Sequence, residues 1–292
     1  MPDPSLLVTA EELAALLADP GRDVVVLDVR WKLGGPPGHE TYLTGHVPGA
    51  VFVDLATELA SHGEPTDGRH PLPAVADLQA AARRWGVRTT STVVVHDGDG
   101  NLAAARAWWL LRWGGLTDVR LLDGALPAWQ AAGLPLATDD VVPAPGDVEL
   151  TGGAMPTLEV DDVERFAATG LLLDARAGER YRGEVEPIDP RAGHVPGAVS
   201  APTTDNLAAD GTFLPAERLR ARFEQVGAGD GVAVAAYCGS GVTAAHEVVA
   251  LALAGFADAS LYVGSWSQWS NLDKPVATGP CEEARPCGPI VQ

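Results

Sequence analysis

Short apolar runs alternate with longer stretches of helical periodicity along most of this chain. Val24–Asp28 and Val93–His96 have the length of strands, and Val75–Trp85, between them, carries apolar residues at helical spacing. Apolar strands separated by helices are typical of a mainly parallel sheet covered on both faces. The pattern therefore predicts an α/β fold. The other strands are predicted at Arg120–Leu122, Leu171–Asp174, Val232–Tyr237 and Ala259–Val263, and the other helices at Leu102–Trp113, Pro215–Val226 and Val242–Ala254.

The same motifs occur twice, in the same order. Gly45-His-Val-Pro-Gly-Ala recurs at residues 193–198, residues 25–30 match residues 172–176, and Trp129 falls opposite Trp269. Several matches in one order indicate two copies of one domain. We place the first copy at residues 1–138 and the second at 157–279. Residues 139–156, rich in Pro, Gly and acids, are predicted to be a linker, and residues 280–292 a tail.

Side chains repeated in both copies are predicted to be structural. His46 and His194 lie in the repeated hexapeptide, and Asp28 and Asp174 each end a predicted strand. Because one copy lacks the candidate chemistry described below, residues that both copies share do not mark a catalytic site.

Charge excludes some classes of partner. The net charge is −19, and acids outnumber bases in both halves, which argues against binding of nucleic acid or of an anionic membrane. No apolar run has the length of a membrane span. The N-terminal residues lack a basic start, and Thr9-Ala-Glu-Glu indicates a capping box that opens a helix. The chain is therefore predicted to be cytoplasmic.

The three cysteines do not form a disulfide framework. Cys281 and Cys287 lie in a Pro- and Glu-rich tail without a third or fourth metal ligand nearby, so no zinc site is predicted there. They could pair under oxidation, but a loose tail is the simpler interpretation. No metal and no cofactor are predicted.

Cys238 has a different setting, at the end of an apolar strand and before a glycine-spaced loop and an Ala- and Val-rich helix. Such a loop directs backbone N–H groups and the positive end of a helix at the sulfur, and these stabilise an anion. Most free cysteines are inert core residues. A core cysteine needs no flanking glycines and hydroxyls, so we interpret Cys238 as a nucleophile.

The first copy carries Asp97 opposite Cys238. A carboxylate can satisfy the amides of such a loop, but it cannot carry sulfur, so only the second copy is predicted to be catalytic. Cysteine-dependent phosphatases have a similar loop, but they need an Arg six residues after the Cys to bind phosphate. Here Ala244 occupies that position, which argues against a phosphatase.

Together these features resemble the rhodanese superfamily, specifically its tandem two-domain sulfurtransferases. The resemblance extends from about Val8 to Thr278, and it implies two rhodanese-like domains, each a mainly parallel sheet with helices on both faces. Thiosulfate-type members carry basic residues after the Cys. Gly239, Ser240 and Gly241 are uncharged, as in the 3-mercaptopyruvate sulfurtransferases.

The resemblance implies a ping-pong reaction in which Cys238 takes sulfur from a small-molecule donor as a persulfide and passes it to an acceptor. The acceptor would be a thiol, such as thioredoxin or a small thiol, or cyanide in an assay. The charged sulfur would be stabilised by the loop amides and by the hydroxyls of Ser240 and Thr243. For Thr243, a bond to its own helix terminus is an equally good interpretation. The loop residues concerned are Gly239, Ser240, Gly241, Val242 and Thr243.

An anionic donor needs cations, and this acidic chain gathers arginines at residues 180–191. Arg180 stands where the family has a substrate-binding Arg. Arg182 and Arg191 both remain candidates for a second one. The alternative is that these arginines pair with neighbouring acids on the surface.

The first copy is expected to complete the cleft. Trp31 matches a family Trp beside the active site, and His70 matches a family His that forms a relay with the loop Ser and an Asp. The family's Asp is expected where this chain has Ala56. His70 would therefore act without that carboxylate, or through solvent.

Two other functions stay open at this point. Thiosulfate could be the physiological donor, because both loop types often share substrates. The chain could also be a rhodanese-like binding module in which Cys238 is only redox-sensitive.

Overall fold

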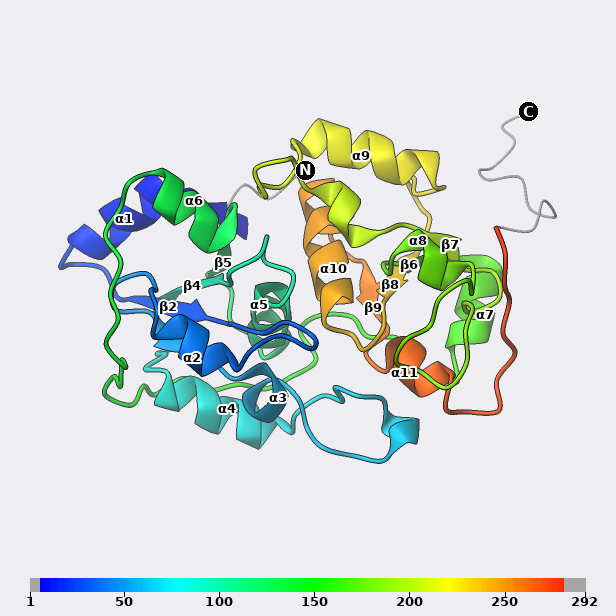
Figure 1. The fold of residues 1–292 in the computed structure, drawn as a ribbon, viewed down its shortest axis with the longest axis horizontal. Helices are drawn as coiled ribbons and strands as arrows, with labels where there is room; N and C mark the ends of the chain where they lie inside the picture. Colours follow the sequence, from blue (N-terminus) through cyan, green and yellow to red (C-terminus); the bar gives the residue numbers. More distant parts are fainter. Residues whose placement is uncertain (1–5, 281–292) are drawn as a thin grey trace.

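The computed structural model describes residues 6–280, which form two α/β domains (Figure 1). The cysteines Cys281 and Cys287, with the predicted tail from residue 281 onward, lie outside the described residues. Within residues 6–280, no helix is long and apolar enough to cross a membrane.

The first domain contains a five-stranded sheet in the order β1-β5-β4-β2-β3, with every pair parallel. Alternate residues of β4 face opposite sides. Val94 packs with the cluster that includes α1 and α6, whereas Val93 and Val95 pack with α4 and α5. The elements are β1 Leu7–Val8, α1 Ala10–Ala18, β2 Val24–Asp28, α2 Gly38–Tyr42, β3 Val51–Phe52, α3 Leu55–Glu58, the 3-10 helix η2 Pro65–Asp67, α4 Val75–Arg84, β4 Thr92–His96, α5 Ala104–Trp113, β5 Val119–Leu122 and α6 Ala125–Ala131.

The second domain repeats this plan with a four-stranded parallel sheet in the order β7-β6-β8-β9. Ala235 of β8 packs with α7 and α11, and Ala236 packs on the side of α9 and α10. The elements are α7 Val163–Thr169, β6 Leu171–Asp174, α8 Gly178–Tyr181, β7 Val199–Ser200, the 3-10 helix η3 Thr203–Asn206, α9 Ala216–Gln225, β8 Val234–Tyr237, α10 Thr243–Leu253, β9 Ser260–Leu261 and α11 Ser265–Trp269.

The predicted α/β class and the predicted strands and helices are confirmed, with ends that differ by at most two residues. The capping box at Thr9 is also confirmed, because its hydroxyl and the Glu12 carboxylate each accept the other residue's N–H. The two-residue strands β1, β3 and β7 are not predicted by the sequence pattern, whereas β9, which is equally short, lies within a predicted strand.

The repeated motifs make the same contacts in both domains. His46 stacks on Tyr42 and His194 stacks on Tyr181, with ring centroids 4.0 and 3.7 Å apart. The carboxylate of Asp28 binds Arg30, and Asp174 binds Arg176 in the same way. Each of these arginines also donates to the carbonyl of the Gly that opens the hexapeptide. These residues hold one turn of each domain, as expected of a structural repeat.

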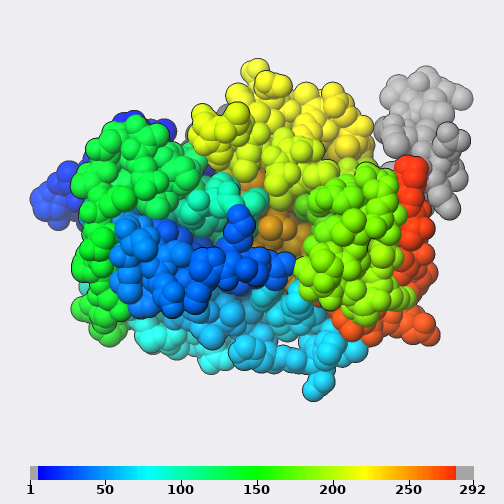
Figure 2. All heavy atoms as spheres, in the orientation of Figure 1, coloured from blue at the N-terminus to red at the C-terminus, as the bar shows by residue number. Residues whose placement is uncertain are grey.

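The domains meet along helices α5 and α10, and a single apolar cluster continues from one domain into the other. Figure 2 shows the surfaces of the two halves in contact across the front of the molecule. The predicted linker follows the first domain closely: the carbonyl of Val148 accepts from Arg83 Nε, and its side chain is fully buried. The two strand-end loops, at residues 97–103 and 238–242, lie near the interface between the domains. Arg106 of the first domain donates to the carbonyl of Gly241, and a Cβ atom on Gly100 would lie 2.8 Å from Leu207 Cδ1.

Candidate active site

Cys238 directly follows β8 and is 2 % exposed. Its N–H donates to Ser265 Oγ at 3.1 Å, and its carbonyl accepts from the N–H of Trp266 at 2.9 Å. These two hydrogen bonds hold the backbone of Cys238 against the start of α11. Ser265 adopts a φ of +54°, which few non-glycine residues adopt. Its counterpart Ala125 has a φ of +55°, but it has no hydroxyl to offer.

The loop after Cys238 turns sharply at Gly241. This residue has a φ of +76°, and a Cβ atom there would lie 2.4 Å from the carbonyl oxygen of Val263, so only glycine fits. No hydrogen bond within residues 6–280 uses the N–H of Gly239, Ser240, Gly241 or Val242. These amides, on a loop that leads into α10, are available to an anionic sulfur.

Thr243 is the first residue of α10, after Val242 at the N-cap position, and no hydrogen bond of its hydroxyl is found among the described residues. The interpretation of Thr243 as a self-capping residue thus has no contact to support it.

The first domain shows what this type of loop binds. The Asp97 carboxylate accepts four backbone N–H groups, from residues 99 and 101 on Oδ1 and from residues 103 and 104 on Oδ2, at 2.8–3.1 Å. Burial raises the pKa of Asp97, while these four amides lower it. In the first domain, therefore, a carboxylate of the chain itself fills the anion site, whereas the second domain presents a thiol.

His70 reaches the loop from the first domain. Its Nδ1 lies 2.8 Å from Ser240 Oγ, and Trp31 packs edge-on against its ring with centroids 5.6 Å apart. The structure thus brings together His70, Ser240 and Trp31, which were predicted to lie in one cleft.

The surroundings of His70 are cationic. Burial, and after it the guanidinium groups of Arg106 and Arg69, together lower its pKa from 6.5 to about 4. Ala56 lies in α3 and supplies no carboxylate. His70 is therefore neutral at neutral pH and can exchange a hydrogen bond with Ser240, but no carboxylate at position 56 stabilises its protonated form.

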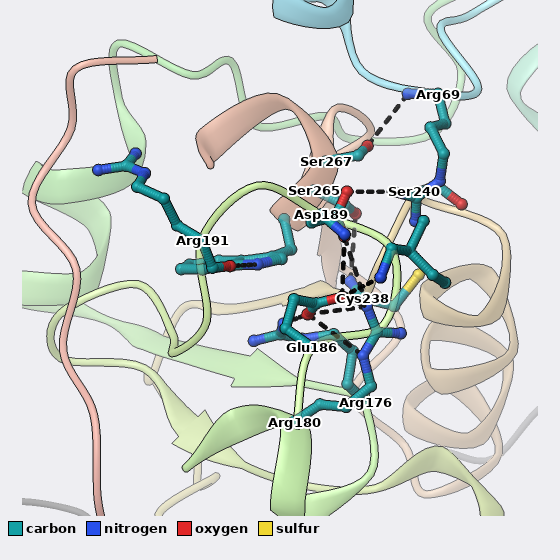
Figure 3. A network of polar contacts seen from close by, with 12 residues as sticks. Arg69, Arg176, Arg180, Glu186, Asp189, Arg191, Cys238, Ser240, Ser265 and Ser267 are labelled. Carbon is teal, nitrogen blue, oxygen red and sulfur yellow. Dashed lines mark hydrogen bonds and ion pairs between the residues drawn. The ribbon is translucent and has the colours of Figure 1, made fainter. Parts of the chain in front are cut away.

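Arg180 lies beside the loop. A Cβ atom on Gly239 would be 3.5 Å from Arg180 Nη1. Its Nη2 binds Glu186 Oε1 at 2.7 Å and lies 3.4 Å from Asp189 Oδ2. Figure 3 shows these three residues grouped beside Cys238.

Arg191 and Arg182, the two candidates for a second binding cation, are engaged elsewhere. The Arg191 guanidinium donates to the carbonyls of Trp269, Ser270, Leu272 and Lys274, where it closes the end of α11. It lies apart from Cys238 in Figure 3. Arg182 is partly exposed and pairs with Glu184 at 2.7 Å. The structure thus brings neither guanidinium to the loop, because nearer acceptors hold both.

Four residues that the sequence did not single out shape the site: Arg69, Arg106, Ser265 and Ser267. Arg106 of α5 is fully buried and donates to the carbonyls of Leu59, His70 and Gly241. Burial lowers its pKa to about 10, and the nearby Cys238 sulfur opposes this shift. Residues 102–111 are apolar except for Arg106. This lone charge was the feature of the sequence that could have identified Arg106 as a functional residue.

Comparison with known proteins decides the family. A model of the rhodanese-like domain matches residues 9–132 and again residues 159–272. The chain belongs to the rhodanese family. This match confirms the predicted resemblance and the predicted fold of two rhodanese-like domains. The relatives of the chain are named sulfurtransferases, which agrees with the predicted enzyme class.

The similarity to rhodanese-family sulfurtransferases extends over nearly the whole chain. A Pseudomonas aeruginosa protein named "Probable 3-mercaptopyruvate sulfurtransferase" is 49% identical, with 94% of this chain and 98% of that protein covered. A Mycobacterium tuberculosis protein named provisionally as a thiosulfate sulfurtransferase is 48% identical, with 94% and 97% covered. The crystal structure of SseA from Escherichia coli, titled as a 3-mercaptopyruvate sulfotransferase, matches with a TM-score of 0.80 and 33% identity, covering 89% of this chain and 98% of that one.

Proposed function

We propose that this rhodanese-family protein transfers sulfur from 3-mercaptopyruvate to a thiol through a persulfide on Cys238. The observation that carries the proposal is the loop itself. It places a thiol before four backbone amides that make no hydrogen bond within residues 6–280, with the neutral His70–Ser240 pair beside it and no charged side chain in the loop. Backbone dipoles suit a sulfur that carries a single negative charge.

In the first half-reaction the Cys238 thiolate attacks the donor's thiol sulfur. An S–S bond forms and the donor's S–C bond breaks, and its electron pair goes to the methylene carbon as the enolate of pyruvate. The donor's thiol proton ends on that carbon, so the products are pyruvate and an anionic persulfide. In the second half-reaction an acceptor thiolate attacks the outer sulfur and returns the Cys238 thiolate.

Ser240 and His70 are placed to assist the first half-reaction. As the S–C bond breaks, negative charge develops on the donor's carbonyl oxygen, and a hydroxyl within the loop can donate to it. His70 accepts the Ser240 hydrogen bond in the resting state and keeps the hydroxyl in the loop. We further propose Arg180 as one cation for the donor's carboxylate.

Thiosulfate is the second candidate donor, favoured by the name of the Mycobacterium tuberculosis relative. A dianionic donor needs more positive charge than this loop offers, since Arg69 and Arg180, the cations beside Gly239, each pair with Glu186 or Asp189. A small thiol or thioredoxin stays the expected acceptor, and the cytoplasm stays the expected compartment.

Mass spectrometry of the intact protein after incubation with each donor tests the proposal. We expect a gain of about 32 Da, one sulfur atom, with 3-mercaptopyruvate. The gain should disappear in Cys238→Ser and on addition of a thiol. Faster loading from thiosulfate would support the second candidate, and no adduct from either donor would favour a binding module.

A further inference from the structure

Two guanidinium groups from different domains meet above the catalytic loop. A Cβ atom on Gly239 would lie 3.1 Å from Arg69 Nη2 and 3.5 Å from Arg180 Nη1. Arg69 precedes His70 in the first domain, and Arg180 belongs to α8 of the second. Because Gly239 follows the nucleophile, both cations lie next to the position of a donor bound at Cys238.

Asp189 links the two arginines. Its Oδ1 binds Arg69 Nη1 and its Oδ2 lies 3.4 Å from Arg180 Nη2, with only 3 % of its side chain exposed. Glu186, equally buried, takes the remaining face of Arg180. The two cations and two carboxylates balance in charge, so a donor carboxylate that approaches the arginines competes with Asp189 and Glu186 for them.

Asp189 is the easier of the two carboxylates to replace. Glu186 also binds Arg176 and accepts the N–H groups of Ile188 and Asp189, so its position is fixed by several partners. Asp189, by contrast, has only the two arginines as hydrogen-bond partners for its carboxylate among the described residues. Burial and the nearby Glu186 carboxylate both raise its pKa, which makes its charged form less stable there.

The backbone of Arg69 is held in place by Ser267 of α11, a serine that has no counterpart in helix α6 of the first domain. Its N–H donates to Ser267 Oγ at 3.0 Å, and the N–H of Ser267 donates to the carbonyl of Gly239 at 2.8 Å. Gly68 permits this approach, since its φ is +87° and a Cβ there would lie 2.9 Å from the Gly264 carbonyl oxygen. The helix α6 of the first copy carries Pro127 in the place of Ser267. One serine therefore ties Arg69 to the loop that carries Cys238.

We propose that Arg69 is the second cation for the donor's carboxylate, acting with Arg180 across the domain boundary, and that Asp189 holds this position until the donor replaces it. The proposal rests on the proposed function, because it assumes a donor with a carboxylate. It assigns to the first domain a direct part in donor selection. It also explains how the site manages without Arg182 and Arg191.

The test compares 3-mercaptopyruvate with its uncharged methyl ester in steady-state kinetics. Arg69→Met should raise KM for the acid about 10- to 100-fold, the loss expected for a hydrogen bond to a charged group. The ester, which lacks the charge, should change little. Arg69→Lys should recover part of the loss, because it keeps the charge without the two-pronged geometry. Arg165→Met, which removes an exposed arginine that pairs with Asp162, is the matched control.

Asp189→Asn provides an independent arm. It removes the competing charge while keeping the shape, so KM for the acid should fall, opposite to the effect of Arg69→Met. Equal losses for acid and ester in Arg69→Met, or a rise of KM for the acid in Asp189→Asn, would overturn the proposal. A wild-type protein that forms no persulfide from the acid would instead overturn the proposed function, so the two failures are distinguishable.

Discussion

The hydrogen bond between His70 and Ser240 gives the most direct test of the catalytic arrangement. Replacing Ser240 with Ala, His70 with Phe, and both together removes the bond from either side. At 2.8 Å in a mostly buried site, it contributes about 1–2 kcal/mol, so each single variant should lose about 5- to 30-fold in kcat/KM. The double variant should lose little more than either single one, because both act through the same bond.

The pH dependence separates this arrangement from a relay that includes a carboxylate. Burial with Arg106 and Arg69 brings the pKa of His70 to about 4, so the ring stays neutral from pH 5 upward. The profile of kcat/KM for 3-mercaptopyruvate should therefore show no His70 ionisation between pH 5 and 8. A step near pH 6.5 that disappears in His70→Asn would refute the reasoning. Arg84→Met, at an exposed site, serves as the control for unrelated charge effects.

Four further outcomes follow from the structure. Arg106→Met should lower the free energy of unfolding by about 3 kcal/mol or more in urea titration, because three carbonyls lose a charged donor. Gly241→Ala should abolish persulfide formation by mass spectrometry, and retained loading would contradict the required φ. Asp97→Cys should lower the melting temperature and gain no second sulfur, since Asp99 stands where the second domain has Ser240 and no His–Ser pair can form there. Between pH 6.5 and 4 the unfolded chain binds a proton that folded His70 does not, so stability should fall with pH in this window, by about 3 kcal/mol at most and less in His70→Gln.

The repeat made the fold and the nucleophile readable from the sequence. Matching motifs aligned the two domains, and the alignment set Cys238 against Asp97. The partners of the arginines could not be predicted in this way, because an arginine binds whichever acceptor the fold places within reach. Arg191 lies in the predicted cluster, yet four carbonyls at the end of α11 hold it.

Contacts across the domain boundary left no local signal. Arg69 is separated from Asp189 by 120 positions, and Arg106 from Gly241 by 135. Neither pair follows from periodicity or from a motif, since each depends on how the two finished domains pack. Ser265 and Ser267 could be found by setting α11 against α6, where the first copy carries Ala125 and Pro127.

The buried Arg106 has a consequence for how the two domains of the chain stabilise each other. Its side chain extends from the first domain to the carbonyl of Gly241 in the second, while Gly100 in the loop after β4 lies against the second domain, where a Cβ atom would be 2.8 Å from Leu207 Cδ1. Each domain thus stabilises the strand-end loop of its neighbour, and unfolding of either one removes a support of the other. The copy that carries Asp97 opposite the thiol therefore belongs to the cooperative unit that shapes the catalytic loop.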